Sequence, residues 1–133
     1  MKKNKKSPYL TGFSQMDEQH DGILQIIDIL VQQLADEEPL NQCLESCTTL
    51  INALRQHYDD EERFMLKSFY PDTEGHIGQH MTYLNHFSKL VNLIQTSHYA
   101  LALSTLKFMR SWILDHMNDA DKKYADFIHH QSA

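Results

Sequence analysis

Apolar residues recur every three or four positions along most of the chain, which is the spacing of one face of an α-helix. The first such stretch begins near Ser14, whose spacing to Asp17 is that of a capping box, and we expect it to end around residues 36–38. Its apolar positions are Ile23, Ile27, Leu30 and Leu34. We therefore predict an amphipathic helix whose buried face, extended back by one turn, includes His20.

Three further stretches have the same helical spacing. They span residues 40–65, 76–94 and 103–124. Pro39 suits the first turn of the second helix, and turn-forming residues at 68–75 separate it from the third. A short break, with Ser97 as the expected N-cap, precedes the fourth helix. Four amphipathic helices joined by short connections predict an all-α fold, an up-down-up-down antiparallel four-helix bundle.

The composition agrees with one helical domain. The chain has 133 residues, enough for a single domain but cramped for two, and it contains only four Gly and three Pro. Few helix-breaking residues favour helices over a turn-rich β architecture. We divide the chain into an N-terminal tail at 1–12, the bundle at 13–128 and a C-terminal tail at 129–133.

Charge, hydropathy and cysteine spacing exclude several classes of protein. A formal charge of −6 argues against a general nucleic-acid role, which needs a concentrated basic face. Four Lys among the first six residues are interpreted as a solvated tail, with a weak contact to an acidic partner as the alternative. Neither a membrane span of roughly 18 apolar residues nor a signal peptide is found, so we expect a cytoplasmic protein. Cys43 and Cys47 lie on one apolar stripe and are expected to be buried without a disulfide.

Histidine is the unusual component of this chain. There are nine, and histidine is the most common metal ligand. Seven polar residues, at least one from each predicted helix, lie on or beside the apolar stripes: His20, His57, Glu61, His76, His80, His116 and Asp121. Residues four apart on a helix differ by about 40°, so the pairs at 57 and 61 and at 76 and 80 can each direct two side chains to one point. The other histidines, His86, His98, His129 and His130, are expected at the surface.

His116 and Asp121 fit this geometry less well. They are five residues apart, about 140° around an ideal helix. Either a π-type bulge or long side-chain reach must therefore bring Asp121 to the site. Buried polar side chains without partners would each cost roughly 1–3 kcal/mol. A shared role in binding metal ions accounts for all seven residues better than chance does.

The donor types indicate which metals fit. Histidine nitrogen and carboxylate oxygen without thiolate suit iron, manganese or zinc. Seven ligands are too many for one ion, so two ions with shared carboxylates are implied. Two octahedral ions offer about twelve positions. Bridging by Glu61 and Asp121, five histidines and one bridging solvent oxygen leave a single position open, on the ion that has two histidines rather than three.

In chain order these motifs resemble those of the hemerythrins, and most closely the single-domain bacterial form, the bacteriohemerythrins. They are Met16-Asp17-Glu18-Gln19-His20, His57-x-x-x-Glu61, His76-x-x-x-His80 and His116-x-x-x-x-Asp121, with supporting matches at Glu61-Glu62, Phe64, Met65, Tyr70-Pro71 and Trp112. The resemblance runs from about Leu10 to Tyr124. Tyr9 and Asp28 depart from it, because the family commonly has a tryptophan near the first position and an asparagine at the second.

The resemblance implies two non-haem irons, an oxo or hydroxo bridge between them, and dioxygen as the ligand. By position, His76, His80 and His116 would bind the closed iron, His20 and His57 the open one, and Glu61 and Asp121 would bridge. We therefore expect reversible dioxygen binding, for storage, delivery or scavenging, rather than an enzyme. Two alternatives stay open: oxygen or redox sensing through a separate partner, and oxidase, peroxidase or nitric-oxide chemistry.

A dry pocket is expected beside the ligands. The inward residues there are almost all apolar: Ile23, Leu24, Leu54, Phe64, Ile77, Leu84, Ile113 and Met117. No second acid, base or nucleophile accompanies them, so the space suits a diatomic ligand better than an organic substrate. We expect Ile113, together with Ile23 and Met117, to border this pocket.

Overall fold

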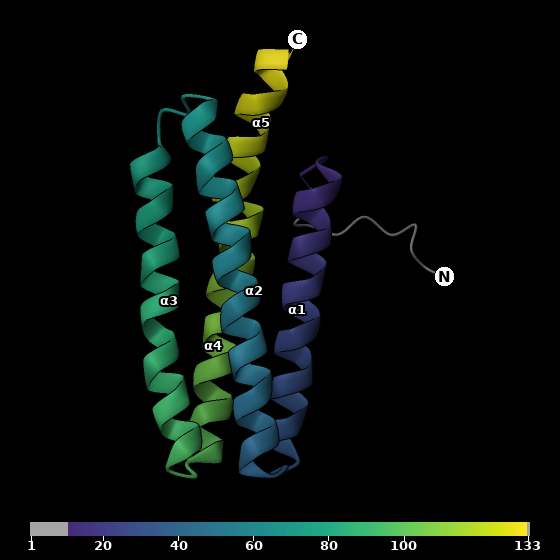
Figure 1. Cartoon of the computed structure of the whole chain (residues 1–133), viewed down its shortest axis with the longest axis vertical. Helices are drawn as coiled ribbons and strands as arrows, with labels where there is room; N and C mark the ends of the chain where they lie inside the picture. Colours follow the sequence, from purple (N-terminus) through teal and green to yellow (C-terminus); the bar gives the residue numbers. More distant parts are fainter. Residues whose placement is uncertain (1–10, 133) are drawn as a thin grey trace, which may run out of the picture.

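The computed structural model describes residues 11–132, and this part of the chain contains five helices and no strand (Figure 1). The helices are α1 (Ser14–Ala35), α2 (Leu40–Lys67), α3 (Thr73–Gln95), α4 (Tyr99–Asn118) and α5 (Ala120–Ser132). None of these helices is long and apolar enough to cross a bilayer. The Lys-rich start of the chain and Tyr9 lie outside the described residues.

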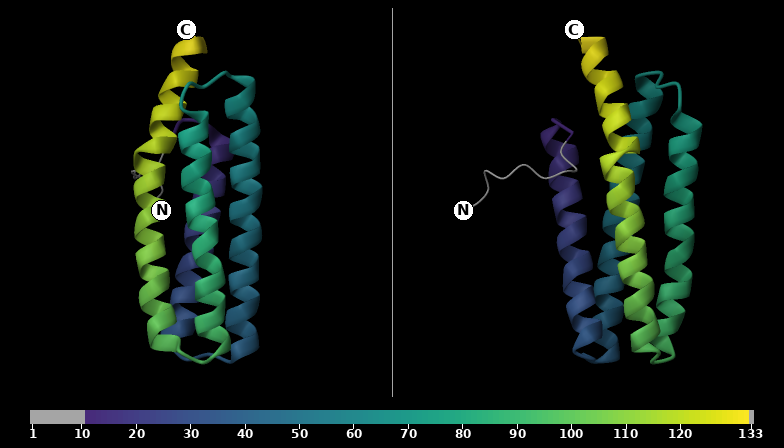
Figure 2. Two further views of the ribbon diagram at one scale, coloured as in Figure 1. Left: turned by 90° about the vertical axis from the view of Figure 1, so that its left-hand side faces the viewer. Right: turned by 180° about the vertical axis from the view of Figure 1, so that it is seen from behind.

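Four antiparallel columns form the bundle. α1 packs against α2 and α4, and α3 packs against the same two helices, so each column has two neighbours (Figures 1 and 2). α5 follows α4 after a one-residue break and continues in the same direction, so the two together make the fourth column. This arrangement confirms the predicted up-down-up-down four-helix bundle.

The buried side chains form two apolar clusters at different heights in the bundle. The larger cluster contains the predicted stripe of α1 and the part of the α2 stripe from Cys43 to Leu54, with partners from α3 and α4. The smaller consists of Met16, Met65, Tyr124 and Ile128. Cys43 and Cys47 are buried in the larger cluster as free thiols, as predicted.

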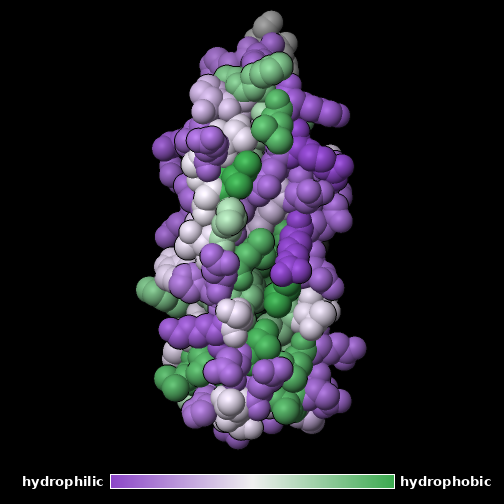
Figure 3. Space-filling model, turned by 60° about the vertical axis from the view of Figure 1, so that its left-hand side comes forward, coloured by the Kyte–Doolittle hydropathy of each residue, from purple (hydrophilic) through white to green (hydrophobic). Residues whose placement is uncertain are grey.

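Some apolar residues remain at the surface. Phe64, expected to face inwards, is 42% exposed, and Ile77 and Leu84 are partly buried. These residues lie at the edges of stripes that are wider than the buried face of their helices, so the prediction for Phe64 is wrong. The side of the molecule around α3 carries strips of hydrophobic surface between hydrophilic side chains (Figure 3).

The start of α1 differs from the predicted capping box. Ser14 lies inside the helix, and Phe13 takes the N-cap position without a side-chain hydrogen bond. Asp17 reaches further back instead, and its carboxylate accepts hydrogen bonds from the backbone N–H groups of Thr11 (2.8 Å) and Gly12 (3.2 Å). The predicted cap residue is therefore wrong, although Asp17 does fix the chain at this helix end.

Three helices end in the same left-handed turn. The residues involved are Glu37, Phe69 and Ser97, with φ angles of 52°, 58° and 63°. After α3, the N–H of Ser97 donates to the carbonyl of Ile94 (3.0 Å), and the N–H of His98 donates to that of Leu93 (2.8 Å). This is the hydrogen-bond pattern of a Schellman motif, and equivalent bonds follow α1 and α2. Ser97 therefore closes α3, and the prediction that it caps the next helix is wrong.

The C-terminal residues 129–132, predicted as a polar tail, continue α5. The His129 ring stacks on Phe13 with a centroid distance of 4.5 Å, and its Nε2 lies 3.1 Å from the carbonyl oxygen of Thr11. These contacts join α5 to the segment before α1. They give residues near the end of the chain a structural partner that no local pattern could indicate.

Candidate metal centre

All seven predicted ligand residues meet in the interior of the bundle. Their exposed fractions lie between 0% and 4%. α1 contributes His20, α2 contributes His57 and Glu61, α3 contributes His76 and His80, α4 contributes His116, and α5 contributes Asp121. Along α1, His20 falls between Met16 of the smaller apolar cluster and Ile23 of the larger one. The polar residues therefore form one layer between two dry clusters.

Asp121 reaches this layer through an interruption of the fourth column. Asp119 has φ −116° and ψ −72°, and its N–H donates to the carbonyls of Asp115 (2.9 Å) and His116 (3.3 Å). Regular helix resumes with the bond from Lys123 N–H to the Asp119 carbonyl. Asp121 Oδ1 then lies 3.0 Å from His116 Nε2. The five-residue spacing predicted a π-type bulge or long side-chain reach, and the structure instead brings Asp121 to the site through a one-residue break at Asp119.

The ligand candidates form two groups that share both carboxylates. One group is Glu61, His76, His80, His116 and Asp121, and the other is His20, His57, Glu61 and Asp121. Within each group, one ligand atom from every residue lies within 4.8 Å of the others. Three histidines therefore face one position and two face the other, with the carboxylates between.

Glu61 directs one oxygen to each group. Its Oε1 lies 2.9 Å from His76 Nε2 and 3.0 Å from His80 Nε2. Its Oε2 lies 3.5 Å from His57 Nε2, on the two-histidine side. The i,i+4 spacing of His57 and Glu61 on α2 puts both side chains on the same helix face.

Asp121 divides its oxygens in the same way. Its Oδ1 lies 2.8 Å from His76 Nε2 and 3.0 Å from His116 Nε2, within the three-histidine group. Its Oδ2 lies 3.0 Å from His20 Nε2, in the other group. Two carboxylates with this division have the arrangement needed to bridge a pair of cations.

Three of the histidines are oriented from outside by polar side chains. His57 Nδ1 lies 2.7 Å from Gln19 Oε1, His80 Nδ1 lies 2.8 Å from Glu62 Oε2, and His116 Nδ1 lies 2.7 Å from Gln79 Oε1. Amide and carboxylate oxygens only accept hydrogen bonds, so each ring donates its Nδ1 proton outwards. A neutral imidazole in this tautomer keeps its lone pair on Nε2, which points inwards and is available to a metal.

The spacing of two ring nitrogens supports a cation at this site. His80 Nε2 lies 3.2 Å from His116 Nε2. Both nitrogens are directed into the same interior space as the carboxylates, with Glu61 Oε1 3.0 Å from His80 Nε2 and Asp121 Oδ1 3.0 Å from His116 Nε2. A metal ion could be bound by both nitrogens here, and nitrogen and oxygen donors without thiolate suit iron. The residues present therefore fit the metal pair that their sequence motifs implied.

Burial sets the protonation of the cluster in the metal-free chain. Burial, reinforced by repulsion from neighbouring histidines, lowers the pKa of His57 to about 3 and that of His80 to about 2. Burial also opposes the charged form of His76, but its hydrogen bonds to Asp121 and Glu61 outweigh it and raise the pKa to about 9. At neutral pH His57 and His80 are uncharged, which is the form that binds metals.

A surface cleft opens onto the two-histidine group. It has a volume of about 410 Å³, its walls come from the start of α1 and the middle of α2, and His57 and Glu61 are among its lining residues. The three residues predicted to border a ligand pocket, Ile23, Ile113 and Met117, belong to the larger apolar cluster and are 1–2% exposed. Their position beside a bound ligand stays a prediction.

The sequence analysis did not identify the outer residues. Gln19, Glu62 and Gln79 each adjoin a ligand in sequence and contact a different ligand on the next helix. Consecutive helical residues point about 100° apart, so a neighbour of an inward ligand faces the adjacent helix. A polar residue next to a predicted ligand in the sequence was therefore the pattern from which these outer residues could have been identified.

The four remaining histidines lie outside the cluster. His98, His129 and His130 are exposed, as predicted. His86 is half-buried, and its ring centroid lies 4.6 Å from that of Trp112. His86 therefore belongs to a surface feature of α3 and α4 rather than to the metal centre.

Comparison with known proteins gives two matches. The family model described as "Hemerythrin HHE cation binding domain" matches residues 11–128. A myohemerythrin from Theromyzon tessulatum is 24% identical over 112 residues, which cover 84% of this chain and 82% of that protein. No solved structure matches significantly. The family match covers the bundle as far as Ile128, including all seven ligand candidates.

Proposed function

The chain belongs to the hemerythrin family, and we propose that it holds two non-haem irons and binds dioxygen reversibly at this centre. The observation that carries the proposal is the division of the Glu61 and Asp121 oxygens between a three-histidine and a two-histidine group. This arrangement supports two adjacent ions with unequal protein coordination. The sequence motifs had implied the same inequality, with one closed ion bound by three histidines and one open ion bound by two.

Each residue has a distinct part in this proposal. His76, His80 and His116 would hold the closed iron, His20 and His57 the open one, and Glu61 and Asp121 would bridge with an oxo or hydroxo group. When bound, the iron pair supplies an open coordination position and the two electrons with which dioxygen is held. Gln19, Glu62 and Gln79 fix the ring orientations, so the Nε2 atoms stay aimed at the ions.

The surroundings favour binding over catalysis. Buried apolar side chains, among them Ile23, Ile113 and Met117, are proposed to limit the access of water and protons to a bound ligand on the interior side. The cleft at His57 and Glu61 gives dioxygen a route in. Ligation rich in histidine stabilises higher oxidation states less than the carboxylate-rich sites of ferritin-like bundles do. We therefore infer a carrier rather than an enzyme. The roles in storage, delivery or scavenging, and the cytoplasmic location, stay predictions.

Optical spectroscopy tests the proposal. Iron-loaded protein is reduced without air, exposed to dioxygen and returned to argon over several cycles. The surface variant His98→Ala is treated in the same way, to show that a histidine outside the centre does not contribute to the signal. We expect a visible band that appears with dioxygen and disappears under argon in both proteins. Irreversible conversion to a ferric form in the first cycle contradicts reversible binding and favours sensing or oxidative chemistry.

A further inference from the structure

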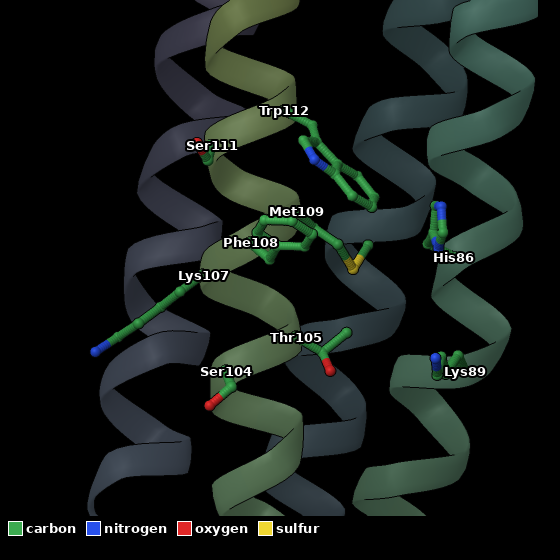
Figure 4. A pocket seen from close by; sticks show the side chains of 9 residues that line it. All are labelled: His86, Lys89, Ser104, Thr105, Lys107, Phe108, Met109, Ser111 and Trp112. Atoms are coloured by element: carbon green, nitrogen blue, oxygen red, sulfur yellow. The ribbon is translucent and has the colours of Figure 1, made fainter.

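A second depression lies on the surface formed by α4 and the neighbouring part of α3 (Figure 4). It has a volume of about 720 Å³, and its lining includes His86, Lys89, Lys107, Phe108 and Trp112. Figure 4 shows that Trp112 extends from α4 towards α3, where His86 and Lys89 lie, whereas Lys107 extends from the opposite side of α4. We call this surface the α3–α4 groove.

The floor of the groove is aromatic and open to solvent. Phe108 is 62% exposed, and its ring centroid lies 4.8 Å from that of Trp112. Trp112 in turn lies 4.6 Å from the His86 ring. Tryptophan and other aromatic side chains are enriched at the centres of protein interfaces, and clustered exposed ones on a soluble domain mark an interaction surface.

The charges around the groove differ from those of the rest of the chain. The lining of the groove includes two basic residues, Lys89 and Lys107, and no carboxylate. Asp115 lines a further depression that adjoins the groove, and Arg110 is paired with Asp28 of α1 at 3.0 Å. Residues 14–72 contain three basic residues and thirteen carboxylates. The groove is thus a locally basic surface on an acidic protein, and its electrostatic complement is an acidic face on a partner.

The groove also leads towards the metal centre. His86 and Trp112 also line the further depression that adjoins the α3–α4 groove, together with Gln79 and Tyr83. Gln79 Oε1 accepts the hydrogen bond from His116 Nδ1 at 2.7 Å, and the Tyr83 ring centroid lies 5.4 Å from that of His116. A partner seated on the groove would therefore be separated from a metal ligand by one layer of side chains.

We propose that the α3–α4 groove docks an acidic electron-donor protein that returns oxidised iron in the centre to its ferrous state. The proposal rests on the proposed di-iron function. Dioxygen can diffuse to its site without a docking surface, whereas electrons cross only short distances and require a donor held close to a ligand. The basic rim selects an acidic donor face, and the aromatic floor brings it within reach of His116.

The electrons that reduce the iron come from the cofactor of the donor protein. Each docking event moves one electron, which reduces one ferric ion to ferrous and oxidises one donor cofactor. Two donor molecules therefore restore one iron pair. No bond forms or breaks in the donor, and solvent supplies the protons that balance the added negative charge.

A reduced, acidic [2Fe–2S] ferredoxin serves as the probe. The fully oxidised, iron-loaded protein is mixed with it in a stopped-flow instrument, and the groove variant Lys89→Glu/Lys107→Glu is compared with Arg55→Glu/Lys67→Glu. The control makes the same charge change at exposed positions of α2. At low salt we expect the second-order rate constant to fall about tenfold or more in the groove variant, with a weaker salt dependence, and to change little in the control. Reduction by dithionite should be equal in both.

Calorimetric binding of oxidised ferredoxin gives a second readout that involves no electron transfer. We expect weaker binding for the groove variant and for Phe108→Ala, and parent-like binding for the α2 control. Equal reduction rates and equal affinities in groove and control variants overturn the proposal. The proposal is also overturned if the parent does not bind ferredoxin but binds anionic vesicles, or associates with itself, and the groove variant loses that binding or association.

The iron content of every sample separates this proposal from the proposed function. A chain that lacks an iron pair defeats the proposed function, whatever the calorimetry shows. A chain that contains the pair and binds dioxygen reversibly, but reacts with ferredoxin equally in both variants, defeats only the docking surface.

Discussion

His80 Nε2 lies 3.2 Å from His116 Nε2, and both rings donate their Nδ1 protons away from the centre. A cation bound to both nitrogens would account for this short separation. Because the same buried residues pack the bundle and are the candidate ligands, we expect metal binding and stability to be linked.

His116→Ala should lose iron and stability together. The change removes one ligand from the three-histidine group and leaves a cavity in a buried layer, at a cost of roughly 2–5 kcal/mol. Iron content and the melting temperature are measured on the same preparation, with exposed His98→Ala as the control. If both quantities match those of the parent, His116 is not a ligand.

Gln79→Leu should weaken iron binding while the bundle stays folded. Without the acceptor, His116 is no longer held in the tautomer that directs Nε2 inwards, and such outer contacts change metal affinity by about 10–100-fold. Competition with a chelator measures the affinity. Gln79→Glu supplies another acceptor and should restore it, and equal affinity in all three proteins would show that this hydrogen bond does not orient the ring.

Much of the fold and site could be predicted because both depend on helical spacing. Ile23, Ile27, Leu30 and Leu34 face one way for the same reason that His57 and Glu61 do, and that reason is local. The roles of the outer residues Gln19, Glu62 and Gln79 were not predicted, although each lies next to a ligand in sequence, because which ligand each contacts depends on how the helices are rotated. The start of α1 near Ser14 and the break after α3 were predicted, but the capping roles of Ser14 and Ser97 were wrong, because Asp17 and Ser97 each make a different local hydrogen-bond pattern. The form of the break at Asp119 depends on the packing of Asp121 against two other helices.

Ile113→Ala should keep both irons but shorten the life of the oxygenated form. Ile113 lies one turn before His116, is 2% exposed and is predicted to border the bound dioxygen, so truncation should open space at that ligand and admit water. We expect a stability loss of roughly 2–4 kcal/mol for the emptied volume. The decay of the oxygenated band is followed at fixed pH and temperature. An unchanged decay rate with full iron content would place Ile113 away from the bound ligand.

Ser97→Gly should stabilise the protein by about 1 kcal/mol, because glycine adopts the left-handed conformation without steric cost. Ser97 has φ 63° at the end of α3 and is exposed, so no buried contact is lost. Urea unfolding measures the change, with Ala53→Gly inside α2 as the control, which should lose about 1 kcal/mol. A destabilised Ser97→Gly protein would show that the serine side chain contributes more than its backbone strain costs.

The stoichiometry of iron and dioxygen tests the central claim most directly. Reduced, iron-loaded protein is titrated with dioxygen in a sealed cell, and iron and protein are quantified in the same sample. The structure predicts two irons per chain and one dioxygen taken up per iron pair, released again when the gas is removed. One iron per chain, or two irons without dioxygen uptake above that of buffer, would contradict a di-iron oxygen-binding centre.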